Sequence, residues 1–318
     1  MGANLEFDAA LAGDSNSAAA LPHHAVEGEM SLAVRLTGAV MATLLASAVI
    51  LGTWRALGGP HYGKAALVDG LYLAQIILAG TLILLGSTVE GFGYGLSLGT
   101  RWPYTRNILV LMWHGDPEAA HRVVATLVGL VALALAVLAP GSDTFSGLSL
   151  VIATALFGMG TLYVLAGKMP ALVHGTHGLL AYAVLLVYLT GMAYPGMDFW
   201  TYLRATSALH PLLLTIFLGG MTTGQRGFGQ PIGAFYRPRR KAHWVVAAHV
   251  VAALSIVATL GWLMPAYPVA FYVALAQISV GFLLFQAVNL APKHPGAIVP
   301  FHQLAVFLIT CAIVFQWR

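Results

Sequence analysis

The chain has 318 residues, of which 59% are hydrophobic and only 8% are charged. Soluble domains carry about 25% charged residues, so the composition excludes an ordinary soluble protein and predicts an integral membrane protein. The formal net charge is +4, but the basic residues stand between the apolar segments, so no nucleic-acid partner is expected. The single cysteine, Cys311, excludes an intrachain disulfide and a cysteine-rich metal centre.

Nine apolar segments long enough to cross a bilayer follow a polar, acidic start of the chain. We expect residues 1–30 to form a soluble tail. The apolar runs are continuous rather than alternating, so they predict helices and not a β-barrel. Their approximate ranges are 36–54, 70–89, 123–142, 145–167, 171–194, 205–224, 242–264, 266–290 and 296–316.

Two connections are longer than the others. The connection after the second span contains Trp102, Trp113 and the apolar run 108–112, which predicts a short helix lying at the membrane interface. The connection after the sixth span is the most basic stretch of the chain. Its cationic residues are Arg226, Arg237, Arg239, Arg240 and Lys241.

Histidines recur at related positions in the two halves of the chain. Each long connection leads into a helix with an early histidine, His121 or His249, and the next helix but one carries a second, His177 or His302. The spacing within each pair is 56 residues (177 − 121) and 53 residues (302 − 249). This pattern predicts an internal duplication.

The predicted fold is therefore an all-α integral membrane protein with two pseudo-repeated four-helix transmembrane bundles. The first unit is expected at 68–195 and the second at 203–318. One additional N-terminal transmembrane helix is expected at 31–55, which brings the total to about nine spans.

The repeated histidines predict two haem sites. An ionisable residue inside a membrane span indicates function, and imidazole is a standard axial ligand of haem iron. Alternate helices of an up-and-down bundle start on the same side, so His121 and His177 are expected to face one another across a haem, as are His249 and His302. His174 and His243 lie one and two helical turns before assigned ligands, and either remains an alternative ligand.

Glu118 and Arg122 flank His121 at the head of its helix. Glu118 is one turn from His121, so its carboxylate could act as an acid or base at the haem edge. It would equally complement the dipole of the helix N-terminus. Arg122 could pair with a haem propionate or extend to the lipid headgroups. The second half has Val246 in place of the acid, which makes the first half the expected site of chemistry.

Several motifs resemble the haem A synthase family, the eight-helix membrane proteins that convert haem O to haem A. The resemblance covers about residues 70–316. The matching segments are Gly93-Tyr-Gly-Leu-Ser97 with Trp102-Pro103, Glu118-Ala-Ala-His121-Arg122, Leu156-Phe-Gly-Met-Gly160 before Pro170 and His177, and Ala276-Gln277-Ile-Ser-Val-Gly281 before His302-Gln303-Leu-Ala305. The chain departs from the family in its additional N-terminal helix, in lacking a cysteine pair in the first long connection, and in having Thr100-Arg101 in place of the usual acidic residue before Trp102.

The resemblance implies an oxidoreductase. His121 and His177 would bind the haem on which a methyl of haem O is oxidised to the formyl of haem A, Glu118 would assist, and His249 and His302 would hold haem b. The alternative is a non-catalytic dihaem cytochrome b, a subunit of a respiratory complex that passes electrons between quinol and a partner. The expected partners are therefore the lipid bilayer, haem, and a quinol, a small redox protein or respiratory-complex subunits, with a homo- or hetero-oligomer possible.

The sidedness of the histidine face stays open. With alternating spans, that face carries 11 of the 15 Lys and Arg residues and the other face carries four. The positive-inside rule places the histidine face in the cytoplasm, whereas the resemblance implies the outside. We expect the chain in the plasma membrane of a prokaryote or an equivalent energy-conserving membrane.

Overall fold

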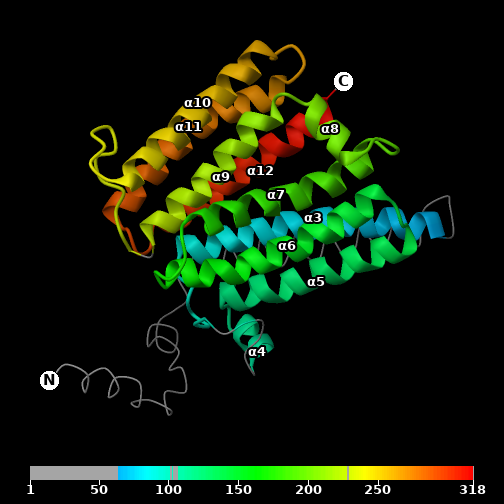
Figure 1. Ribbon diagram of the computed structural model, residues 1–318, viewed down its shortest axis with the longest axis horizontal. Helices are drawn as coiled ribbons and strands as arrows, with labels where there is room; N and C mark the ends of the chain where they lie inside the picture. The colour runs from blue at the N-terminus through cyan, green and yellow to red at the C-terminus, as the bar shows by residue number, and fades with distance from the viewer. Residues whose placement is uncertain (1–63, 101, 103–106, 228, 318) are drawn as a thin grey trace, which may run out of the picture.

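The computed structural model describes residues 64–100, 102, 107–227 and 229–317, and over these residues it is helical without strands. The expected tail 1–30 and the expected helix 31–55 lie outside the described residues. The helices, labelled as in Figure 1, are α3 (Lys64–Gly91), α4 (Ile108–Trp113), α5 (Pro117–Leu138), α6 (Ser142–Leu165), α7 (Leu172–Ala193), α8 (Phe199–Ala205), α9 (Leu209–Arg226), α10 (Lys241–Trp262), α11 (Pro268–Leu290) and α12 (Ile298–Gln316).

Seven of the described helices are long and apolar enough to cross a membrane, which supports the expectation of an integral membrane protein. They are α3, α5, α6, α7, α10, α11 and α12. Their outer faces suit lipid. On α5, for example, Leu130, Leu133 and Val137 recur every three or four residues and are exposed.

The expected sixth span, 205–224, differs from the structure. The segment forms two helices, α8 and α9, bent by 98° at a short break, and only together do they qualify as an eighth span. The side chain of Asp198 caps the start of α8, because it accepts a hydrogen bond from the backbone N–H of Thr201 (2.9 Å). Pro211 then falls in the first turn of α9, where its missing N–H costs nothing.

The two expected units of four spans are in extensive contact, because α7 and α9 pack on each other as closely as helices within either unit. In the first unit, α3, α5, α6 and α7, each helix contacts the next around a closed ring, and the contacts are most extensive within the α3/α5 and α6/α7 pairs. The second unit contains α9, α10, α11 and α12, with α9/α10 and α11/α12 as its tight pairs and only a loose contact between α10 and α11. Each unit is thus two tight helix pairs with a looser seam between them.

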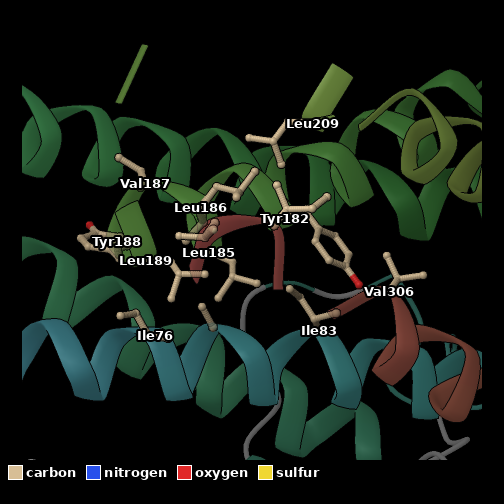
Figure 2. Close-up of a cluster of buried hydrophobic side chains, with 14 of the residues drawn as sticks. Ile76, Ile83, Tyr182, Leu185, Leu186, Val187, Tyr188, Leu189, Leu209 and Val306 are labelled. Atoms are coloured by element: carbon tan, nitrogen blue, oxygen red, sulfur yellow. The ribbon is translucent and has the colours of Figure 1, made fainter. Parts of the chain in front are cut away.

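Helix α7 is the centre of the molecule. It packs on α6 and α3 in its own unit and on α9 and α12 in the other. Figure 2 shows the buried residues of its middle turns, among them Tyr182, Leu185 and Tyr188, packed with Ile83 of α3 and Val306 of α12. One continuous hydrophobic core therefore joins the two units.

Glycines bring α7 and α9 into backbone contact. A Cβ atom on Gly175 would lie 2.7 Å from the carbonyl oxygen of Phe217, and one on Gly220 would lie 2.9 Å from the Cα of Gly175. Such close approach is how helices associate in lipid, where apolar side chains gain little by leaving the solvent.

Candidate functional site

All four predicted histidine ligands stand near the starts of helices that begin at one end of the molecule, the end on the left in Figure 1. Helices α3, α6, α9 and α11 end there, and α5, α7, α10 and α12 begin there. His121, His177 and His302 stand in the first two turns of their helices, and His249 is one turn deeper. The rings are half-buried.

Each ring lies against a glycine of the partner helix in its own tight pair. A Cβ atom on that glycine would come within 3.0 to 3.6 Å of the ring carbon Cε1, which is tight or close contact. The histidine–glycine pairs are His121 with Gly86, His177 with Gly158, His249 with Gly219 and His302 with Gly281. The same arrangement thus occurs once in each of the four helix pairs.

A carbonyl group one turn before the glycine fixes the orientation of two of the rings. The Nδ1 atom of His177 lies 3.0 Å from the Thr154 carbonyl oxygen, and that of His249 lies 3.0 Å from the Thr215 carbonyl oxygen. A carbonyl oxygen only accepts, so Nδ1–H is the donor and Nε2 keeps its lone pair. This is the arrangement that fixes the tautomer of a metal-binding histidine.

The rings of His121 and His302 do not form this hydrogen bond to a backbone carbonyl group. The carbonyl group of Leu82, one turn before Gly86, faces His121, although the buried Nδ1 atom has no well-formed hydrogen bond. The Nδ1 atom of His302 lies 2.9 Å from Nε2 of the Gln277 side chain. Gln277 again stands one turn before the glycine.

Within each unit, the two histidines belong to opposite helix pairs. His121 belongs to the α3/α5 pair and His177 to the α6/α7 pair, and His249 and His302 are divided in the same way between α9/α10 and α11/α12. Two imidazoles from opposite sides of a loose seam can bind one metal centre as axial ligands.

His243 and His174, the two alternative ligands, differ in whether their ring nitrogens have hydrogen-bond partners. His243 accepts a hydrogen bond from the backbone N–H of Arg239 at Nδ1 (3.1 Å), and its Nε2 lies 3.1 Å from the carbonyl oxygen of Ile232. Both ring nitrogens therefore hold the connection before α10. His174 has a buried Nδ1 atom without a hydrogen-bond partner among the described residues and lies near His177, so it remains the alternative ligand in the first unit.

Glu118 is buried, and its carboxylate is engaged by three groups. It accepts hydrogen bonds from the Ser97 hydroxyl (2.9 Å) and from the backbone N–H of Leu98 (3.1 Å), and it forms an ion pair with Arg122. These contacts fasten the first long connection to α5. Glu118 and Arg122 thus lie one turn before and directly after His121, but they are paired with each other.

A second buried ion pair, not expected from the sequence, joins the two units near the same end. Arg226 of α9 donates to Glu90 of α3 (2.8 Å) and to the carbonyl oxygen of Pro292 (2.7 Å). The only signal in the sequence is that each residue is a lone charge at the end of an apolar run. Beside it, a small pocket, partly open to solvent and mostly apolar, is lined by residues that include Thr222, Ile232 and Val246.

The donor set fits haem better than a metal held by side chains alone. Among the described residues, no group of three or more His, Cys, Asp or Glu side chains is placed to hold a metal ion. Zinc sites need three or four such ligands, whereas haem iron needs only one or two from the protein because the porphyrin supplies the others.

Comparisons with known proteins add no assignment. No protein-family model, no curated protein and no solved structure matches this chain.

Proposed function

We propose that this chain is a dihaem membrane protein, with one haem held by His121 and His177 and a second by His249 and His302. The observation that supports this most is the repeated environment of the four rings, each against a glycine and with Nδ1 directed at a group one turn earlier. We also propose that the two units are a duplicated four-helix module. With α8 and α9 counted as one span and the segment 36–54 as another, the chain has nine spans.

By its resemblance to haem A synthases, the first haem is haem O and the reaction is oxidation of one of its methyl groups to the formyl of haem A. The bound haem supplies the redox-active iron for that oxidation. The residues of the chain orient it, since the glycine contacts and the Nδ1 hydrogen bonds set the planes of the imidazoles. The second haem is haem b and carries electrons to the first, within an energy-conserving membrane.

One observation favours the alternative, a dihaem cytochrome b that only transfers electrons. The Glu118 carboxylate is occupied by Ser97, Leu98 and Arg122. An acid or base in a reaction needs a partner at the substrate, whereas these contacts are those of a residue that stabilises the fold. In this second candidate, a quinol or a small redox protein delivers electrons at the histidine end.

The deciding experiment is expression in a host that makes haem O but lacks its own synthase, followed by extraction and chromatography of the haems. Haem A or a hydroxylated haem O is the expected product. Two haems b per chain without haem A would overturn the synthase assignment in favour of the cytochrome. A purified chain without haem would overturn both.

Glu118→Gln separates the two functions further. The amide oxygen still accepts from Ser97 and Leu98 but can neither hold a proton for transfer nor carry a charge. If Glu118 takes part in the reaction, conversion of haem O falls at least tenfold while the haem content and absorption spectrum are kept. If it is structural, Glu118→Gln retains the conversion per folded chain, and both Glu118→Gln and Glu118→Ala lower the yield of folded protein because the buried ion pair with Arg122 is lost.

A further inference from the structure

One of the four histidine positions differs chemically from the other three. The backbone carbonyl groups of Thr154 and Thr215 accept from Nδ1 of their rings, and the Leu82 carbonyl faces His121 without a well-formed hydrogen bond, whereas at the fourth position the side chain of Gln277 takes that place. The Nε2 atom of Gln277 lies 2.9 Å from the Nδ1 atom of His302 and 2.9 Å from the carbonyl oxygen of the same residue.

These two contacts determine the tautomer of His302. A backbone carbonyl oxygen only accepts hydrogen bonds, so the Gln277 atom beside it is the amide nitrogen. That nitrogen has two hydrogens, and its second one points to Nδ1 of His302. Nδ1 is then an acceptor, so the proton of the neutral ring sits on Nε2.

The resulting tautomer is the opposite of that in His177 and His249. Those rings donate from Nδ1 to a carbonyl oxygen and keep a lone pair on Nε2, ready for a metal. For His302 to bind through Nε2, its proton must move to Nδ1. The Gln277 amide must then turn its oxygen to the ring and give up the hydrogen bond to the His302 carbonyl.

From this contrast we infer that the second haem site has an exchangeable coordination position on the His302 side, which takes a small neutral ligand such as carbon monoxide. This inference rests on the proposed binding of haem by His249 and His302. Gln277 is the positioning residue. If haem binds there, His249 would hold the iron more firmly than His302, and the first site has no glutamine at either position equivalent to Gln277.

The test is carbon monoxide binding to the purified full-length chain in detergent, reduced with dithionite and followed by its absorption spectrum. We expect about half of the bound haem to react. His121→Leu removes the first haem, and the reactive fraction should rise to nearly all of the haem that remains. Loss of carbon monoxide binding in His121→Leu would overturn the inference, because it would place the reactive iron in the first site.

Gln277→Thr tests the role of the amide directly. It installs the residue present at positions 154 and 215, so His302 can donate from Nδ1 to the backbone carbonyl and bind iron firmly. The carbon monoxide-reactive fraction should fall at least fivefold with two haems still bound. Gln286→Thr, on the exposed side of the same helix, is the matched control and should leave the fraction unchanged.

The possible outcomes are distinguishable. A wild-type chain with two haems that are both inert to carbon monoxide overturns this inference alone, whereas a chain without haem overturns the proposed function. If Gln277→Thr folds poorly, Gln277→Leu, which installs the residue of position 82, serves as the second variant. Unchanged reactivity in either folded variant would show that Gln277 does not control the position.

Discussion

At the scale of single residues, the glycine opposite each histidine is as informative as the histidine itself. It leaves room for the edge of the imidazole that carries Cε1 and Nδ1 to approach the backbone of the neighbouring helix. The closest case is Gly158, where a Cβ atom would lie 3.0 Å from Cε1 of His177.

Gly158→Ala is therefore expected to displace the His177 ring and weaken its bond to iron. The expected readout is loss of the low-spin spectrum of the first haem, with the second haem unaffected. Gly178→Ala is the control, because it is next to His177 in sequence but a Cβ atom there would meet nothing within 4 Å. Equal effects of the two changes would show that the glycine contact is unimportant.

The sequence predicted which histidines would gather at one end, because helix starts alternate regularly between the two sides of a membrane. It did not predict the glycine contacts, since the chain has 35 glycines and only the rotation of each helix selects four of them. The partners of Glu118 were also missed. They come from the connection at Ser97 and Leu98, whose path depends on tertiary contacts rather than on local pattern.

At the scale of helices, the contact between α7 and α9 leaves no room for a larger side chain at its glycines. Gly175→Ala places a methyl group 2.7 Å from the Phe217 carbonyl oxygen and 2.6 Å from Cγ of Met221. A backbone oxygen cannot rotate away as a side chain can, so the helices must separate. We expect a loss of about 1–3 kcal/mol, measured by thermal unfolding in detergent, again with Gly178→Ala as the unaffected control.

The start of α8 is capped by Asp198. Hydrogen bonds from the backbone N–H of Thr201, and then from the Ser142 hydroxyl, hold the pKa of Asp198 below its usual value. A lowered pKa in the folded state stabilises the fold above the ordinary pKa of aspartate, and this stabilisation is lost as the pH falls through the lowered value. Asp198→Ala should lower the melting temperature at pH 7 and flatten its fall on acidification, whereas Asp198→Asn, which still caps the helix, should keep most of the stability at pH 7.

The extents of most spans followed from the apolar runs, but the bend between α8 and α9 did not. The break falls at residues 206–208, at the start of the expected span, so the sequence indicated a helix start there but not a second helix before it. The capping signal at Asp198 precedes the run, where it is easily assigned to a connection. Helix α5 also begins earlier than its apolar run predicts. It starts at Pro117, directly after the capping residue Asp116, which is six residues before the expected start at 123.

At the scale of the whole molecule, the ion pair of Glu90 and Arg226 is a polar bond between the two units in an otherwise apolar contact. Breaking a buried pair leaves an uncompensated charge. Glu90→Gln and Arg226→Met should therefore each destabilise the protein by about 3 kcal/mol. The double variant should lose less than the sum of the two, as expected for residues that act on each other.

The double-mutant cycle is measured by thermal unfolding in detergent, with Arg204→Met as the control at an exposed position on α8. An additive double variant would mean that the two charges contribute independently. The sequence indicated two groups of helices, but it could not show how they are joined. That depends on residues 136 positions apart in the chain.

The location of all four histidines at one end of the molecule has an electrical consequence. Haems held there would lie at similar depths in the bilayer, so an electron passing from one to the other would move parallel to the membrane plane. A charge that moves across the bilayer does work of about 2.3 kcal/mol per 100 mV, but a charge that moves within the plane crosses none of this field. The internal electron transfer of this protein would proceed at the same rate in an energised membrane as in a depolarised one, and it would neither consume nor generate membrane potential.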